Sequence, residues 1–265
     1  MMAQIYVGTS GFSYEDWVGP VYPPDLPKSE WLTYYATELG LNACELNFTF
    51  YRMPNHYTLI QLADKVPPGF RFTLKAPRMF THEREQAQEE DWNTFRRVLH
   101  PLEEEDKFGC VLVQFPYSFH NTPENRDYLR GIREHWPDLP LVVEFRNRGW
   151  VHESVFTLLR ELNMGFCGVD QPRFRNLIPP IAVVTSDIGY VRFHGRNKDK
   201  WWHHEHAWER YDYAYSKEEL MEWVPKIREM SEHAKVIYLF ANNHYRGKAV
   251  QTAQLLQSLL KHEIE

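Results

Sequence analysis

The sequence has few cysteines, no long hydrophobic run and no excess of basic side chains. Its three cysteines, Cys44, Cys110 and Cys167, stand at no metal-ligand spacing and each lies in an apolar run, so we expect buried free thiols. No apolar run approaches the roughly 20 residues of a membrane-spanning helix. The amino-terminal residues also lack the pattern of a signal peptide. These absences predict a cytoplasmic protein without a membrane partner.

The total charge is negative, with 36 acidic and 30 basic side chains and a formal net charge of −6. A general binder of duplex nucleic acid is usually basic, because neutralising phosphates drives its affinity. The total charge therefore argues against that function, although a local basic patch is compatible with it. Aromatic side chains, by contrast, make up 15% of the chain. They can form the core or provide flat surfaces around a cleft.

Short strand-like runs alternate with helical patterns along the whole chain, which is typical of parallel βα units. The expected strands are 5–8, 43–47, 71–75, 110–115, 141–145, 166–170, 190–194 and 236–242. The expected helices are 28–39, 55–65, 89–103, 124–135, 152–162, 216–233 and 246–262. A length of 265 residues matches one complete (β/α)8 barrel, for which about 250 residues is typical. We therefore predict a single TIM-barrel domain over residues 1–265.

Two connections differ from the regular βα pattern. Residues 171–189 contain three prolines and no clear helical pattern, so the sixth crossover is expected to be irregular. Residues 195–215 form a long connection rich in Trp, His and Tyr. Connections of this length are uncommon in a compact domain and often have a function.

Charged or amide residues end nearly all of the expected strands. Because side chains two residues apart on a strand share a face, Glu144 lies with Arg146 and Arg192 lies with His194. In a barrel the carboxyl ends of the strands meet at one mouth, where the catalytic groups of such enzymes lie. A ligand site is one interpretation of this polar ring. A salt-bridge network, such as Glu144 with Arg146 or Arg192, is the structural alternative.

These strand ends fall within blocks that are similar to a known family. The blocks are GTSGFSYEDWVGPVYP (8–23), ELNFTFYRMP (45–54), FTLKAPRMFTH (72–82), VQFPYSF (113–119), VEFRNRGW (143–150), YVRFHGR (190–196), YDYAYS (211–216) and FANNH (240–244). In this order they resemble the YecE-like family, the domain of unknown function numbered 72. The resemblance implies a TIM barrel distantly similar to the xylose isomerase and endonuclease IV group, and it implies no established reaction. The family's motif positions carry over here as Glu45, Asn47, Lys75, Arg78, His82, Gln114, Glu144, Arg146, Arg192, His194, Asn242 and Asn243.

Three ionisable residues are the candidate catalytic groups: Glu45, Glu144 and His194. The two carboxyl groups could form an acid–base pair, one with its pKa raised by burial and one held ionised by arginine. Glu45 could instead be a structural partner of Lys75. His194 could act as a general acid or base, or it could be a hydrogen-bonded structural histidine.

The expected mouth is cationic despite the acidic total. Forked guanidinium groups suit phosphate or carboxylate, so we expect a small anionic ligand. The candidate substrate-binding residues are Asn47, Lys75, Arg78, His82, Gln114, Arg146, Arg192, Arg196, Asn242 and Asn243.

The same cations oppose a bound metal, because they would repel a divalent ion among the carboxylates. His203, His204 and His206 have neither HExxH nor CxxC spacing, and the loop 8–11 is not a nucleotide-binding fingerprint. We therefore expect neither a metal nor a cofactor. Two functions remain: a metal-independent enzyme for a phosphorylated sugar or nucleotide-like substrate, and an endonuclease IV-like protein that binds or processes nucleic acid and stacks bases on an aromatic loop.

Overall fold

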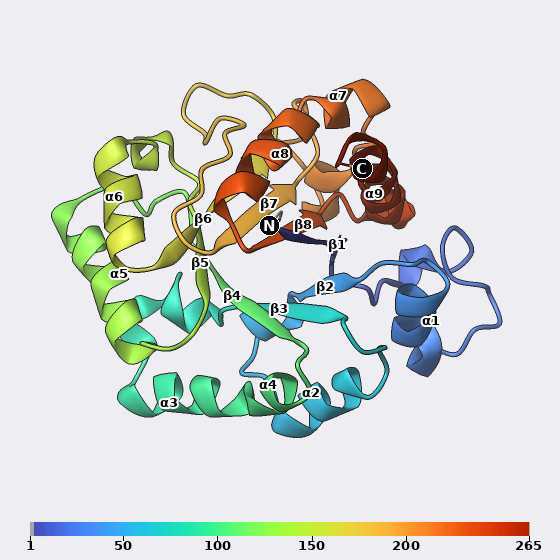
Figure 1. The fold of residues 1–265 in the computed structure, drawn as a ribbon, viewed down its shortest axis with the longest axis horizontal. Coiled ribbons are helices and arrows are strands. Elements are labelled where there is room, and N and C mark those ends of the chain that lie inside the picture. Colours follow the sequence, from blue (N-terminus) through green and yellow to red (C-terminus); the bar gives the residue numbers. More distant parts are fainter. Residues whose placement is uncertain (1–2, 265) are drawn as a thin grey trace.

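Eight parallel strands form a closed barrel in the computed structural model, which describes residues 3–264 (Figure 1). The strands are β1 (Gln4–Ser10), β2 (Ala43–Leu46), β3 (Arg71–Lys75), β4 (Phe108–Gln114), β5 (Leu141–Glu144), β6 (Met164–Asp170), β7 (Ile188–Phe193) and β8 (Val236–Ala241). Neighbours in the chain are neighbours in the barrel, and β8 pairs with β1 from Gln4↔Val236 to Thr9↔Ala241. The predicted (β/α)8 barrel is confirmed.

Helices surround the barrel: α1 (Trp31–Thr37), α2 (His56–Ala63), α3 (Glu89–Val98), α4 (His100–Glu104), α5 (Pro123–His135), α6 (Glu153–Glu161), α7 (Lys217–Met221), α8 (Val224–His233) and α9 (Lys248–Ile264). Two of the predicted helices are each divided in two, near Pro101 and near Pro225. Proline lacks the backbone N–H of a helix interior and is tolerated in a first turn, so each new helix begins there. A capping box at Ser216 and Glu219 begins α7.

The crossover from β6 to β7 contains no helix in residues 171–187, which confirms its expected irregularity. The segment instead runs extended against the barrel, where Thr185 Oγ1 donates to the Met164 carbonyl oxygen at 2.6 Å. Gly168 on β6 permits this close packing, because a Cβ there would lie 2.7 Å from the Ile181 carbonyl oxygen.

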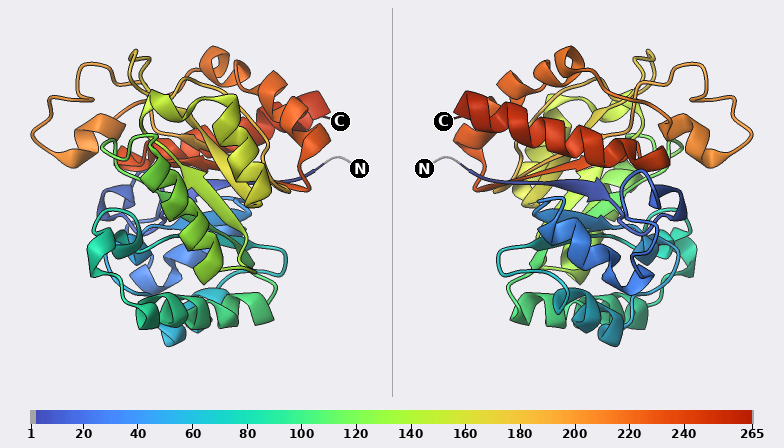
Figure 2. Two further views of the ribbon diagram at one scale, coloured as in Figure 1. Left: turned by 90° about the vertical axis from the view of Figure 1, so that its left-hand side faces the viewer. Right: turned by 90° about the vertical axis from the view of Figure 1, so that its right-hand side faces the viewer.

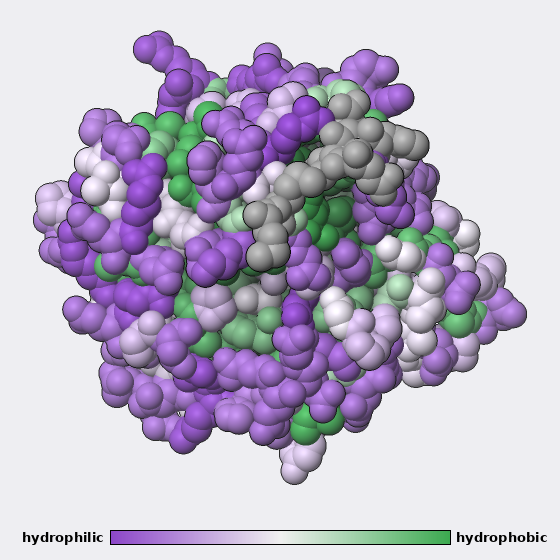
Figure 3. All heavy atoms as spheres, viewed as in Figure 1, coloured by the Kyte–Doolittle hydropathy of each residue, from purple (hydrophilic) through white to green (hydrophobic). Residues whose placement is uncertain are grey.

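The three cysteines are buried and free, as expected. Much of the core lies between the barrel and its helices, and α9 runs along β1 (Figure 2). The outer face drawn in Figure 3 is mostly hydrophilic. Among residues 3–264, no helix is both long enough and apolar enough to cross a membrane. The connection 195–215 projects from the end of the molecule opposite the two chain ends (Figure 2).

Candidate active site at the carboxyl ends of the strands

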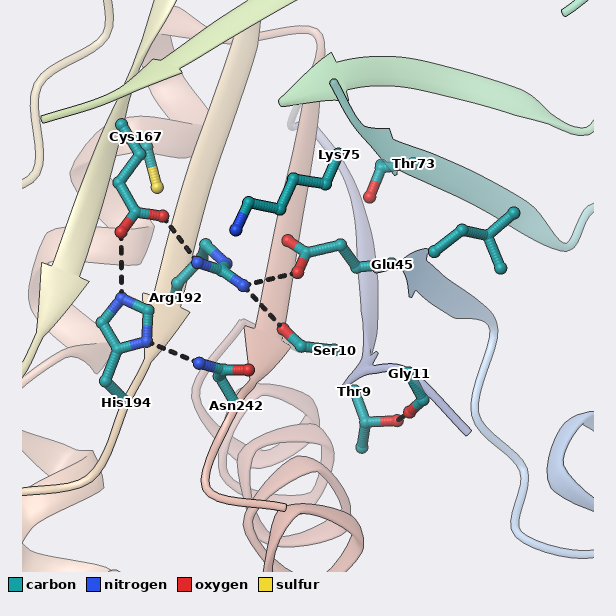
Figure 4. A network of polar contacts seen from close by, with 12 residues as sticks. Thr9, Ser10, Gly11, Glu45, Thr73, Lys75, Cys167, Arg192, His194 and Asn242 are labelled. Atoms are coloured by element: carbon teal, nitrogen blue, oxygen red, sulfur yellow. Dashed lines mark hydrogen bonds and ion pairs between the residues drawn. The ribbon is translucent and has the colours of Figure 1, made fainter. Parts of the chain in front are cut away.

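Arg192, on β7, lies between two buried carboxylates inside the barrel (Figure 4). Its Nη2 donates to Glu45 Oε1 at 2.6 Å, and its Nη1 donates to Glu144 Oε2 at 2.7 Å. Burial alone would raise the pKa of Glu144, but Arg146 and Arg192 outweigh it and hold that pKa well below its usual range. Arg146 Nη2 lies 3.0 Å from Glu144 Oε1. The two carboxylates and two guanidinium groups therefore neutralise one another where water is excluded.

Glu45 has a second hydrogen-bond partner inside the barrel, the hydroxyl group of Tyr190. The Tyr190 hydroxyl donates to Glu45 Oε2 at 2.7 Å and lies 3.0 Å from Thr73 Oγ1. The structural partner of Glu45 is thus Arg192 together with Tyr190, whereas the sequence suggested Lys75. The Glu45 carboxylate is fully buried and both of its oxygens have donors.

His194 links this network to β8 and is also fully buried. Asn242 Nδ2 lies 2.9 Å from His194 Nδ1, and His194 Nε2 lies 3.2 Å from Glu144 Oε1. The amide therefore donates to Nδ1, and Nε2 carries the proton that it donates to Glu144. Burial and then Arg146 lower the pKa of His194 to about 3, against the opposing effect of Glu144. This neutral imidazole positions Glu144, and both of its nitrogens are occupied.

A cavity of about 410 Å³ opens beside this network. Its polar lining comes from Asn47, Lys75, Gln114, Arg146, Arg192 and Asn242, and most of its aromatic lining comes from Phe12, Tyr14, Phe48, Phe50, Tyr51, Tyr211 and His244. The volume lies within the range of small-molecule sites, and convergent polar groups among apolar walls are typical of them.

Lys75, the last residue of β3, is the unpaired cation of this cavity. Its ammonium group forms no hydrogen bond or ion pair with other residues in the described range 3–264, and Figure 4 draws it beside Arg192 and Glu45 without a contact to either. Its Nζ lies 3.8 Å from the centroid of the Phe50 ring. Burial is the largest cause that lowers the pKa of Lys75 to about 7, and Arg192 and Arg146 together lower it by more than Glu144 and Glu45 raise it.

Two buried polar atoms in the cavity wall also lack partners among the described residues. They are Asn47 Oδ1 and His244 Nδ1, both buried. His244 stacks on Tyr14 with ring centroids 4.7 Å apart, and burial lowers its pKa, so it is neutral at pH 7. Buried polar atoms without partners are rare in proteins and indicate places for ligand or water.

Four of the expected binding residues do not line the cavity. Arg196 pairs with Asp170 at 2.7 Å and with Glu222 at 3.1 Å. Asn243 Nδ2 donates to the Tyr213 carbonyl oxygen at 2.8 Å and to Thr252 Oγ1 at 2.9 Å. The other two lie at the surface: Arg78 pairs with Glu83 at 2.6 Å, and His82 Nδ1 lies 2.8 Å from Thr81 Oγ1. These contacts are structural, so their binding role has no support from the geometry.

Other wall residues were not among the sequence-based candidates, chiefly Tyr14, Phe50, Tyr211 and His244. They lie in loops or short 3-10 segments, where strand parity gives no direction. Their positions inside the family-like blocks were the available signal. Tyr211 is the one residue of the long connection 195–215 that lines the cavity, among those whose side chains the structure describes. Trp201 is buried near His194, and Trp202 is exposed beside Tyr117.

Residues 3–264 contain no group of three or more His, Cys, Asp or Glu side chains arranged to hold a metal ion. The position between Glu45 and Glu144, where a cation would be attracted, is filled by the Arg192 guanidinium.

The closed parallel barrel, with its polar cavity at the carboxyl ends of the strands, defines a TIM-barrel protein. Within this class, the chain belongs to the family described as "Protein of unknown function DUF72", whose model matches residues 6–265.

Relatives in this family cover almost the whole chain. A DUF72 family protein from Thermotoga maritima has a solved structure with a TM-score of 0.90 and 41% identity, covering 97% of this chain and 99% of that one. A second, from Enterococcus faecalis, has a TM-score of 0.86 and 28% identity, covering 97% and 96%. The UPF0759 protein YunF of Bacillus subtilis is 28% identical over 97% of this chain and 94% of its own. A D-psicose 3-epimerase from Clostridium cellulolyticum shares only the fold, with a TM-score of 0.58 and 8% identity over 98% and 99%.

Proposed function

We propose that the cavity is the active site of an enzyme for a small anionic substrate, of the phosphorylated sugar or nucleotide-like class, that requires no bound metal. The observation that carries this proposal is Lys75, a cation in the cavity wall that contacts the Phe50 ring but has no hydrogen bond or ion pair to another described residue. A structural lysine in such a place would be expected to pair with one of the carboxylates nearby.

The charges of the site favour an anion. Glu45 and Glu144 are already matched by Arg192 and Arg146, and His194 is neutral. Lys75 is therefore the surplus charge, and Arg146 remains partly accessible beside it. A phosphate or carboxylate group placed against Lys75 and Arg146 would complete the pairing with charge-assisted hydrogen bonds.

The remaining polar groups suit hydroxyl groups on the same ligand. Asn47 Oδ1 can accept a hydrogen bond from a hydroxyl, His244 Nδ1 can accept or donate one according to its tautomer, and the amides of Gln114 and Asn242 line the same space. A phosphorylated sugar offers both the anion and the hydroxyl donors, and it fits a cavity of about 410 Å³.

The proton-transfer group favoured by this geometry is Lys75. Efficient acid–base catalysis needs a pKa near the working pH, and that of Lys75 is lowered to about 7. His194 and Glu144 bond to each other, and Glu45 bonds to Arg192 and Tyr190. We therefore assign these three residues to positioning the site.

Anion binding tests the proposal through thermal stabilisation by sulfate, an anion whose charge is constant near neutral pH. Wild type is compared with Lys75→Met and Arg146→Ala, and with the exposed control variants Lys198→Met and Arg175→Ala. Loss of one charge-assisted contact, about 1.5–3 kcal/mol, should weaken sulfate binding roughly ten- to a hundredfold. In wild type the shift should also diminish as the pH rises through about 7, because Lys75 loses its charge.

Equal shifts in Lys75→Met and Lys198→Met would contradict the proposal, as would no shift with sulfate or any sugar phosphate. Binding of single-stranded oligonucleotides with a steep salt dependence, in place of these small anions, would favour the nucleic-acid alternative.

A further inference from the structure

We propose that Lys75 is a nucleophile that forms an imine with a carbonyl carbon of the substrate. The substrate class is then an anionic carbonyl compound, such as a 2-oxo acid or the open-chain form of a phosphorylated sugar. The inference rests on the proposed function, because it takes the same cavity as the place where the anion binds.

The position of Lys75 suits attack on a bound molecule. It ends β3, so its backbone is fixed by the barrel, and its side chain lines the cavity. The carboxylates that could hold its ammonium group are engaged elsewhere: Glu45 by Arg192 and Tyr190, and Glu144 by Arg192 and His194. The Nζ instead faces the Phe50 ring at 3.8 Å. This cation–π contact favours the ammonium form, whereas burial and a second cation nearby, Arg192, favour the neutral amine, as is typical of activated lysine nucleophiles.

The protonation state agrees with the geometry. An amine attacks only when it is neutral, and an ordinary lysine is neutral in about three molecules per ten thousand at pH 7. With a pKa lowered to about 7, Lys75 is neutral in about half of the molecules at that pH. A surface lysine has no comparable neutral population.

The reaction conserves atoms and charge. The Lys75 Nζ lone pair forms an N–C bond to the carbonyl carbon, and the C=O π electrons move to oxygen. That oxygen takes one proton that nitrogen releases, which gives a carbinolamine. The hydroxyl oxygen then takes a proton from solvent, the C–O bond breaks to release water, and the nitrogen lone pair forms the C=N bond, so the product is a protonated imine that carries the charge of that added proton. No oxidant or reductant is needed.

The charges around Lys75 are compatible with a protonated imine that carries an anionic group. When Lys75 is neutral, Glu45 and Glu144 balance Arg146 and Arg192. A protonated imine adds one positive charge to this balanced set. The anionic group of the same substrate supplies one negative charge, so an anionic carbonyl compound is favoured over a neutral one.

Reductive trapping tests the inference on the full chain. The protein is incubated at pH 7 with glyoxylate and sodium cyanoborohydride, which reduces an imine to a stable secondary amine. Intact mass should rise by one carboxymethyl group, and peptide mapping should place it on Lys75 ahead of the other lysines. Lys75→Arg should abolish the modification, whereas Lys198→Arg should retain it.

Additional labelling experiments distinguish the imine at Lys75 from the proposed anion site. Acetaldehyde is a neutral carbonyl compound of the same carbon number, and it should label Lys75 more slowly than glyoxylate. Sulfate should slow labelling by glyoxylate, and Arg146→Ala should reduce the preference for glyoxylate. The wild-type peptide map needs no variant to fold, so it gives a result in every case.

The outcomes are distinct. Labelling spread evenly over surface lysines, while sulfate still stabilises the protein, overturns the imine and leaves the anion site intact. Labelling of Lys75 that neither sulfate nor Arg146→Ala affects supports the nucleophile and overturns the anion site. Neither labelling nor stabilisation overturns both.

Discussion

Replacing Lys75 with Met is expected to make the protein more stable while it weakens anion binding. Methionine keeps an unbranched stem that can still pack against Phe50, and it removes a buried cation whose ammonium group has no ion pair among the described residues. The four charges that remain, on Glu45, Glu144, Arg146 and Arg192, still balance.

The size of this effect follows from the pKa of Lys75, which falls from 10.5 to about 7 on folding. Below pH 7 the residue is protonated in both the folded and the unfolded chain, and the difference corresponds to about 5 kcal/mol against folding. Between pH 7 and about 10.5 the unfolded chain binds more protons than the folded one. Wild type therefore gains stability relative to the variant as the pH rises, and the remaining penalty is about 1 kcal/mol near pH 10.

Chemical denaturation of wild type and Lys75→Met at several pH values from 6 to 10 measures this difference. Other groups titrate in both proteins and largely cancel, so the changing gap reports Lys75. Lys198→Met, an exposed substitution, should show a gap near zero that does not change with pH. A variant less stable than wild type at pH 6, or a gap that stays constant to pH 10, would refute the reasoning.

Two further predictions concern the paired arginines. Arg192→Ala should lower the free energy of unfolding by about 3–5 kcal/mol, because the buried carboxylates of Glu45 and Glu144 are left with one guanidinium group, that of Arg146, to balance both charges. Denaturation at pH 7 measures this loss. A loss below about 1 kcal/mol would mean that other groups balance the carboxylates. Arg196→Ala should also destabilise the protein, because Asp170 loses its ion pair, yet leave the sulfate-induced shift of Tm unchanged; a lost shift would place Arg196 in the anion site after all.

The barrel and much of the site could be predicted from local patterns. Alternation along each strand determines which side chains enter the barrel, so Glu144, Arg192 and His194 share one interior. The same rule predicts that Asn243 points to the opposite face from Asn242, and in the structure Asn243 donates a hydrogen bond to Thr252 of α9. The sequence thus contained the reason to separate these two neighbours.

The alternation of side chains between the two faces ends where a strand ends, so it does not predict the direction of residues that follow the strand. Gly195 has a φ of +88°, so the chain turns after β7, and Arg196 leaves the interior to pair with Asp170. Tyr14 and His244 come from loops on opposite ends of the chain, and only the closure of β8 on β1 brings their rings together.

The amino-acid sequence by itself determined the fold, the face of each strand and the gathering of charged groups at one end of the barrel, because these depend on short-range periodicity. Only the tertiary structure decided which charges pair. Arg192 reaches Glu45 across the barrel, and the two carboxylates are satisfied by Arg192, Tyr190 and His194 at β7 together with Arg146 after β5. Lys75 is left over from that pairing, since the packing that buries it offers it no acceptor among the described residues. Electrostatic neutralisation depends on distances of a few ångströms between distant segments, and those distances exist only once the barrel has closed.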